Sequence, residues 1–196
     1  MEKETLKNIF NFLEEKEAHK MPSLWKWLNN EPLTEDDLII NDDLDLSNRK
    51  ITSLPEGLKV DGYLNLSQTD IESLPKDLKV RSHFILKDTN IKTLPKGLKF
   101  NSDLQLQNCK NLKYLPEDLN VRGSLYLGYC KNLNSLPEGL YVGGLLDLSN
   151  TLLTSLPKGL KVWTTLYIRN TPLEKFSDEE LKEMVYPGFI KGKIER

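Results

Sequence analysis

Few side chains of this 196-residue sequence could carry out covalent chemistry. The histidines, His19 and His83, could act as general bases, and the cysteines, Cys109 and Cys130, could act as nucleophiles. Neither histidine sits in a recognisable active-site motif. His19 ends a charged segment, and His83 belongs to an alternating segment in which it would face solvent or contact a partner. The sequence therefore predicts that the protein is not an enzyme.

Sites for metals or cofactors are also missing from the sequence. The acidic run from Asn41 to Asp45 lacks the ligand spacing of an EF-hand loop. Two cysteines are too few for a four-ligand zinc site or a disulfide framework. The sequence contains neither a phosphate-binding glycine loop nor a dinucleotide fingerprint. We expect no metal and no cofactor.

The charge balance narrows the choice of partners. The chain has 27 Lys and Arg against 29 Asp and Glu, a formal net charge of −2, so it has no overall basic field to attract nucleic acid or an anionic membrane. No apolar run is long enough to span a membrane or to act as a signal peptide. We expect a cytoplasmic protein without a membrane partner, and a monomer or weak oligomer.

The elements that position these residues are repeats. Leu-Pro pairs begin at Leu54, Leu74, Leu94, Leu115, Leu136 and Leu156, at intervals of 20 or 21 residues. Each interval approximates the pattern L-P-x-x-L-x-V-x-x-x-L-x-L-x-x-T-x-I-x-x. Period-two alternation around L-x-L predicts one parallel strand per coil, with leucines inward and the intervening side chains outward. A single coil cannot form a core, so the coils must stack. The repeats run over residues 38–176, about six and a half coils.

This period, with L-x-L and Leu-Pro in each coil, resembles the leucine-rich repeat family, most closely its short bacterial type. The resemblance implies a right-handed solenoid with a parallel β-sheet on one face and an extended or turn-rich convex side. It also implies a bacterial or viral source and a role as an effector, inhibitor or adaptor. The sequence departs from the family where the leading leucine is replaced by Asp61, Arg81, Asn101, Arg122, Gly143 or Trp163. A right-handed parallel β-helix is therefore the alternative fold.

The ends of the solenoid need caps. At the N-terminal end, residues 1–37 are predicted to form a helical cap, with helices over 3–18 and 23–28. At the C-terminal end, residues 177–196 are predicted to form a helix and a strand, because Ser177 and Glu180 make a capping box and Pro187-Gly188 ends the helix.

Cys109 and Cys130 occupy equivalent positions in adjacent coils, in a column that otherwise holds mainly threonine. Their backbones should lie about 5 Å apart. Two parallel side chains seldom offer the dihedral angle of a disulfide. We predict buried free thiols.

The outward residues of the sheet form the candidate binding site. The buried positions hardly change between coils, whereas the outward positions carry acidic, basic, aromatic and aliphatic residues in no repeating order. Tyr, Trp and Arg are typical anchors of protein interfaces. We predict that a protein or peptide binds Tyr63, His83, Ile85, Gln105, Tyr126, Leu145, Asp147, Trp163, Tyr167 and Arg169.

Repeated lysines support an alternative function. Two columns contain them, one after the L-P-x-x-L leucine and one after Leu-Pro. Stacked like charges repel, so such columns can mark a site for nucleic acid or another polyanion, although a solvated ridge that protects the sheet edge is the favoured explanation. The candidate anion-binding residues are Lys59, Lys76, Lys79, Lys96 and Lys99.

Overall fold

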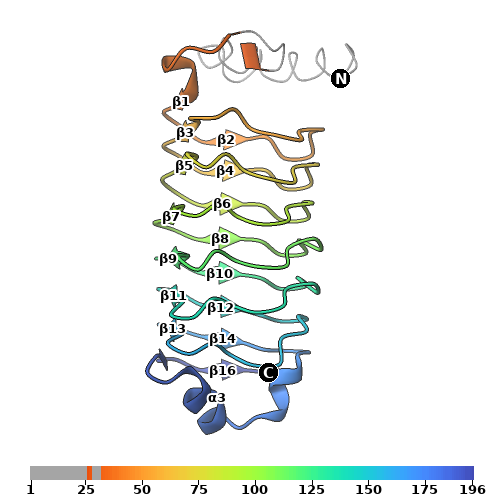
Figure 1. Ribbon diagram of the computed structural model, residues 1–196, viewed down its shortest axis with the longest axis vertical. Helices are drawn as coiled ribbons and strands as arrows, with labels where there is room; N and C mark the ends of the chain where they lie inside the picture. The colour runs from red at the N-terminus through yellow and green to blue at the C-terminus, as the bar shows by residue number, and fades with distance from the viewer. Residues whose placement is uncertain (1–25, 28–31) are drawn as a thin grey trace.

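The computed structural model describes residues 26–27 and 32–196, and over these residues the chain forms a parallel β-solenoid. The coils stack along the long axis of the molecule, from the N-terminal coil at the top of Figure 1 to the C-terminal helix at the bottom. The strand partners lie 20 or 21 residues apart along the repeats, as the spacing of the Leu-Pro pairs predicts. The predicted parallel stacking of coils is confirmed.

Seven segments at the L-x-L position of the repeat and one strand of the C-terminal cap form an eight-stranded sheet. Its order is β16-β14-β12-β10-β8-β6-β4-β2, and every pair is parallel and in register. The strands are β2 (Leu44–Asp45), β4 (Leu64–Asn65), β6 (Phe84–Ile85), β8 (Leu104–Gln105), β10 (Leu125–Tyr126), β12 (Leu146–Asp147), β14 (Leu166–Tyr167) and β16 (Ile194–Glu195).

A second row of strands precedes the first in each coil. It is divided into a three-stranded sheet and a five-stranded sheet, again parallel throughout. The first contains β1 (Ile39–Ile40), β3 (Lys59–Val60) and β5 (Lys79–Val80), and the second contains β7 (Lys99–Phe100), β9 (Asn120–Val121), β11 (Tyr141–Val142), β13 (Lys161–Val162) and β15 (Phe189–Ile190).

Strands therefore occupy two sides of each coil, whereas the sequence predicted a sheet on one face. A bend over residues 61–63 and its equivalents separates the two rows. The backbones of adjacent coils approach closely there, because a Cβ atom on Gly62 would collide with Asp43 and one on Gly143 would collide with the carbonyl of Arg122. The predicted burial of Val60, Leu64 and Leu66 on one side is confirmed. Two strand rows per coil agree with the β-helix alternative.

A left-handed turn follows each strand of the eight-stranded sheet except the C-terminal strand β16. Its φ angles lie between 56° and 65°, and the residues are Asn48, Gln68, Asp88, Asn108, Tyr129, Asn150 and Asn170. Asparagine and aspartate tolerate this conformation better than other non-glycine residues. The third side of each coil carries the Leu-Pro pair in extended segments without strands, as predicted.

The core is one continuous column of apolar side chains, most of them aliphatic, from Ile40 to Ile190. Buried threonines run beside it, and each hydroxyl donates to the carbonyl three residues earlier, as Thr69 does to Leu66 at 2.7 Å and Thr151 to Leu148 at 2.7 Å. Because these hydroxyl groups are bonded, they can lie inside without a large desolvation cost.

The C-terminal segment contains the predicted helix, but two strands follow it where one was predicted. The short helices η2 (Pro172–Lys175) and α3 (Asp178–Val185) follow the last coil, and Ser177 and Glu180 make the capping box. Strands β15 and β16 then extend the two sheets.

At the N-terminal end the structure describes η1 (Asp36–Leu38) and the helical residues Lys26 and Trp27. Lys26 binds Asp37 at 2.7 Å, and Trp27 packs against the core. The other residues of the predicted helices, 3–18 and 23–28, lie outside the described part of the chain. No helix within the described part is long and apolar enough to cross a membrane.

Candidate binding surface

The outer face of the eight-stranded sheet is a ladder of three residue columns. Strand pairing sets the central column in register, from Asp45 through Asn65, Ile85, Gln105, Tyr126, Asp147 and Tyr167 to Glu195. With about 4.8 Å between strands, the column is about 34 Å long. One flanking column lies two residues earlier in the chain and contains Tyr63, His83 and Leu145, and the other lies two residues later and contains Lys87 and Arg169. We call the three columns the sheet face.

Nine of the ten predicted partner-binding residues lie on the sheet face. They are Tyr63, His83, Ile85, Gln105, Tyr126, Leu145, Asp147, Tyr167 and Arg169. His83, Tyr167 and Arg169 are exposed, and the other six are half-buried between their neighbours. The face therefore presents polar, aromatic and aliphatic side chains of neighbouring coils to one another and to solvent.

Trp163 is the exception, because it lies at the bend before the sheet. Its ring meets Phe189 edge-on with 5.3 Å between ring centroids, and the Lys191 ammonium lies 4.5 Å from the ring centroid. Both partners belong to or follow β15, in the C-terminal cap. The indole is still 41% exposed. Trp163 thus fastens the cap to the last coil, and the sequence could not show this because its partners lie outside the repeat.

Several aspartates of the sheet face accept hydrogen bonds from backbone amides. Asp43 Oδ1 accepts a hydrogen bond from Tyr63 N at 2.9 Å, and Asp103 Oδ1 accepts one from Ser124 N at 2.7 Å. Asp147 Oδ1 accepts one from Ser149 N at 2.9 Å. The first two hydrogen bonds join adjacent coils, and the third stabilises the turn that follows the strand.

The tyrosines of the central column differ from these acids. The hydroxyl groups of Tyr126 and Tyr167 make no hydrogen bond to any other described residue. Ile85 and Leu145 add half-buried aliphatic surface. A tyrosine hydroxyl with no intramolecular partner can bond a ligand without breaking a protein contact. The tyrosines and aliphatic side chains are therefore the part of the face best suited to contact a partner.

The structure brings Ser102 and Asp103 to His83, which the sequence did not reveal. Ser102 Oγ lies 3.0 Å from His83 Nδ1, and Asp103 Oδ2 lies 3.5 Å from the same nitrogen. A nucleophilic triad needs the serine and the acid on opposite nitrogens of the ring. Ser102 Oγ also lies 3.5 Å from His83 Nε2, but it is closest to the nitrogen that Asp103 faces, which is not the triad arrangement. The cluster joins two neighbouring coils at the rim of the sheet face.

Cys109 and Cys130 are free and buried, as predicted. Their thiols donate to the carbonyl groups of Leu86 at 3.1 Å and Leu106 at 3.0 Å in the preceding coil. The hydrogen bond with Cys109 and burial among apolar side chains raise the pKa of the Cys130 thiol. Because a reactive cysteine needs an accessible thiolate, this environment suits a structural pair.

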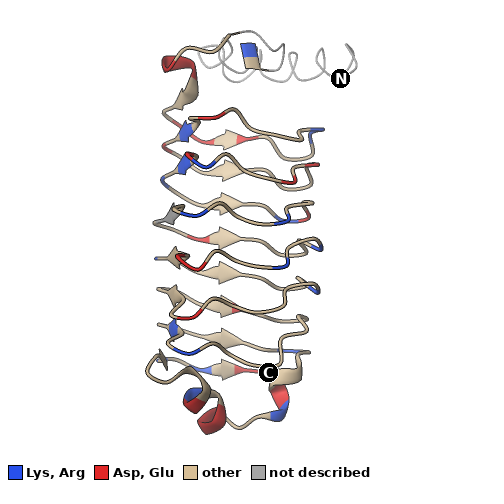
Figure 2. Ribbon diagram, viewed as in Figure 1, with Lys and Arg blue, Asp and Glu red and all other residues tan. Residues whose placement is uncertain are grey.

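The lysine columns are interrupted by other residues and lie close to acidic side chains. Lys59 and Lys79 are exposed neighbours in register, but Figure 2 shows that the column is interrupted at β9 and β11. A hydrogen bond from the Gly57 amide, together with the charge of Lys79, lowers the pKa of the Asp77 carboxyl. Lys76 and Lys96 are exposed on the Leu-Pro side, and Lys99 lies in β7. The predicted lysines thus lie on two sides of the coil, and Asp77 lies beside Lys59, Lys76 and Lys79.

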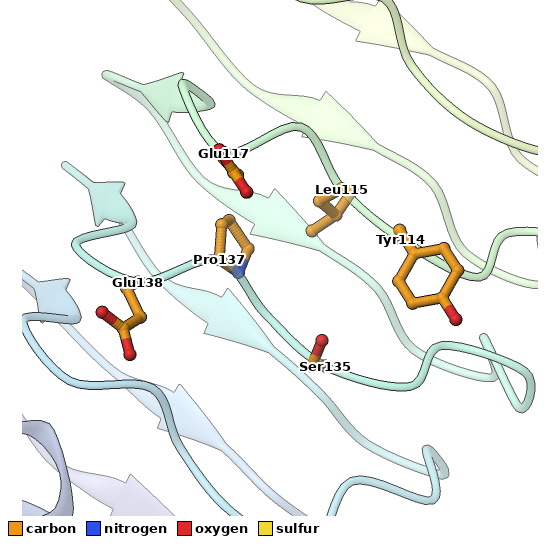
Figure 3. Close-up of a pocket in the computed structure, with 6 residues that line it drawn as sticks. All are labelled: Tyr114, Leu115, Glu117, Ser135, Pro137 and Glu138. Carbon is orange, nitrogen blue, oxygen red and sulfur yellow. The ribbon is translucent and has the colours of Figure 1, made fainter.

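A hollow that sequence reasoning missed lies on the Leu-Pro side. It has a volume of about 600 Å³ and is lined by Tyr114, Leu115, Glu117, Ser135, Pro137 and Glu138 from two adjacent coils (Figure 3). The signal in the sequence is Tyr114, because the equivalent residue is serine or threonine in the other five Leu-Pro coils.

The described residues contain no group of three or more His, Cys, Asp and Glu side chains that could hold a metal ion. Comparison with protein-family models, curated proteins and solved structures found no significant match to this chain.

Proposed function

We propose that this solenoid is a non-catalytic scaffold that binds a protein or peptide on the sheet face. The observation that carries the proposal is the contrast between the two sides of one sheet. Inward positions hold an aliphatic or aromatic residue in every coil, as in the column from Leu44 to Leu166. Outward positions change chemistry from coil to coil and include Tyr126 and Tyr167, whose hydroxyl groups make no hydrogen bond to another described residue. Stacked repeats offer such extended surfaces for recognition.

The resemblance to leucine-rich repeats adds the biological part of the proposal. Short Leu-Pro repeats imply a leucine-rich-repeat-like protein of bacterial or viral origin that acts as an effector, inhibitor or adaptor. This part rests on the repeat pattern alone, because a solenoid can host many functions.

The double variant Tyr126→Ala/Tyr167→Ala tests the sheet face. Both side chains lie on the surface of the sheet, so we expect almost no change in thermal unfolding but a loss of partner capture from a lysate of the source organism, read by mass spectrometry. Tyr186→Ala is the matched control, because Tyr186 is an exposed tyrosine at the end of α3. If the double variant retains every protein that the control retains, the sheet face is not the binding site.

A second function, binding of a polyanion, is favoured by the exposed neighbours Lys59 and Lys79. This proposal predicts that a random oligonucleotide is retarded in a low-salt gel shift, and that salt or the Lys59→Gln/Lys79→Gln variant abolishes the retardation. Absence of retardation at low salt would eliminate this function.

A further inference from the structure

The C-terminal half of the sheet face carries two tyrosines at a fixed spacing. Tyr126, Asp147 and Tyr167 follow one another in register on β10, β12 and β14. The tyrosines therefore lie two coils apart, with one carboxylate between them. At about 4.8 Å per coil, their Cα atoms are about 9.6 Å apart along the solenoid axis. A chain that contacts both rings has to repeat at this distance.

Each of these three side chains has a polar atom that no other described residue bonds. The hydroxyl groups of Tyr126 and Tyr167 are two such atoms. Asp147 Oδ1 accepts a hydrogen bond from Ser149 N at 2.9 Å, but its Oδ2 has neither a hydrogen bond nor an ion pair in the described part of the chain. This oxygen lies 3.2 Å from the position that a Cβ atom on Gly128 would occupy, so the neighbouring coil leaves it uncovered there.

The spacing of the tyrosines discriminates between conformations of a bound peptide. In a polyproline II helix three residues rise about 9.3 Å, so residues i and i+3 face the same side at a distance within about 0.3 Å of the tyrosine spacing. In a β-strand the residues on one side are about 6.7 Å apart. In an α-helix residues i and i+7 are about 10.5 Å apart. The polyproline II helix fits best.

Hydrogen bonding favours the same conformation. An α-helix uses its carbonyl groups internally, whereas a polyproline II helix has no internal hydrogen bonds and keeps its carbonyl groups available as acceptors. The two tyrosine hydroxyl groups can donate to such carbonyls. Proline rings also pack on aromatic side chains. Leu145, half-buried in the same coil as Asp147, adds apolar surface beside the tyrosines.

We propose that this part of the sheet face binds a proline-rich peptide in the polyproline II conformation. Two prolines three residues apart contact Tyr126 and Tyr167, and a basic residue between them pairs with Asp147. The inference rests on the proposed function and names its class of partner. Successive residues of the helix point about 120° apart, so a lysine or arginine between the prolines leaves at the side and reaches the carboxylate with its long side chain. The peptide lies along the solenoid axis, across the strands.

The probe for the test is a capped peptide with the sequence Pro-Arg-Ala-Pro-Arg-Ala-Pro between serines. Its control contains the same residues in the order Pro-Arg-Pro-Ala-Pro-Arg-Ala, in which no two prolines are three residues apart. Each peptide is titrated into ¹⁵N-labelled protein, and amide chemical shifts are followed by NMR. We expect the probe to shift the signals of Tyr126, Asp147 and Tyr167, and the control peptide to need an at least tenfold higher concentration. Equal responses would overturn the proposal.

Variants then assign the contacts. Tyr126→Phe/Tyr167→Phe keeps both rings but removes the hydroxyl groups, so the half-saturating concentration should rise about tenfold. Asp147→Asn keeps an oxygen for Ser149 N but removes the charge, and the rise should be about threefold. This variant should also lose the preference for the probe over the same peptide with citrulline in place of arginine. Tyr186→Ala is the matched control, because it removes an exposed tyrosine outside the sheet face. Unchanged binding by the double phenylalanine variant would contradict the contacts.

The double variant Asp147→Tyr/Tyr167→Asp tests the spacing itself. It keeps the composition and charge of the column but brings the two tyrosines into adjacent coils, about 4.8 Å apart. We expect it to lose the probe while its circular dichroism spectrum stays that of the unsubstituted protein. Probe binding at full strength would show that the spacing is not recognised, and the proposal would fail.

The same titration separates this inference from the proposed function. If the probe shifts no signal of the sheet face, although Tyr126→Ala/Tyr167→Ala still loses its partner from the lysate, the polyproline II inference is wrong and the proposed function stands. If the probe shifts no signal and the alanine variant also retains every captured protein, both are wrong.

Discussion

Replacing Tyr129 by asparagine should stabilise the protein. Tyr129 has φ 65° in the left-handed turn, where the six equivalent residues are Asn, Asp or Gln. The left-handed conformation costs an ordinary L-residue about 1–2 kcal/mol, and asparagine pays less of this cost. The tyrosine is 53% exposed, so its removal loses only part of its contact area. We therefore expect Tyr129→Asn to raise the free energy of unfolding by about 1 kcal/mol, with a rise of about 2–4 °C in Tm for a chain of this size.

The new asparagine would also join a ladder of polar side chains. Asn170 Nδ2 donates to Asn150 Oδ1 at 3.2 Å, and Tyr129→Asn would place an amide in the coil before Asn150. The assay is urea unfolding followed by circular dichroism, with the midpoint compared at an unchanged slope. Tyr114→Asn is the control, because Tyr114 is equally exposed but does not have a positive φ. A midpoint that falls or stays the same in Tyr129→Asn, or rises equally in the control, would refute the reasoning.

Three further predictions concern the core. Thr151→Val should lower the free energy of unfolding by about 1 kcal/mol, measured by urea unfolding, because it removes the buried hydroxyl that donates to Leu148. The raised pKa of Cys130 should lower stability as pH rises above about 8.5, because the folded thiol stays protonated while the unfolded chain loses its proton. The lowered pKa of its hydrogen-bonded neighbour Cys109 acts in the opposite direction. Cys130→Ala removes the first contribution, so this variant should lose less unfolding free energy between pH 8 and pH 10 than the unsubstituted protein, as measured by urea unfolding at the two pH values. Phe84 is fully buried in a column of leucines, so Phe84→Ala should cost about 3–5 kcal/mol and Phe84→Leu markedly less, and equal losses of unfolding free energy would contradict this.

The features that repeat along the chain could be predicted from sequence. The period fixes the parallel register, and the leucines of L-x-L are buried as alternation requires. The C-terminal helix could also be predicted, because a capping box involves residues only three positions apart, Ser177 and Glu180. The buried state of Cys109 and Cys130 followed from their place in the threonine column.

Contacts between coils could not be predicted in the same way. At the bend over residues 61–63, Gly62 lies too close to Asp42 and Asp43 of the preceding coil to carry a Cβ atom, and this contact depends on the three-dimensional stacking. Alternation places Asp43 and Asp103 on the outward face of the sheet, but it does not predict that they bond amides 20 and 21 residues away. Trp163 was placed on the binding surface although it packs against Phe189, a residue outside the repeat. Each of these depends on a neighbour that the repeat pattern does not specify.

The two coils with 21-residue spacing concentrate the departures from the repeat. They contain Tyr114 and Tyr129, and their cysteines replace threonine. In a 20-residue coil the Thr89 hydroxyl donates to the carbonyl of its own coil, whereas the Cys109 thiol donates to the coil before it. The added residue thus changes the segment that follows the left-handed turn, while the strands keep their register. Since the regular coils on either side hold this segment rigidly, side chains altered there can meet a partner at little cost in ordering. On this argument the longer coils should contribute more to recognition than the regular ones.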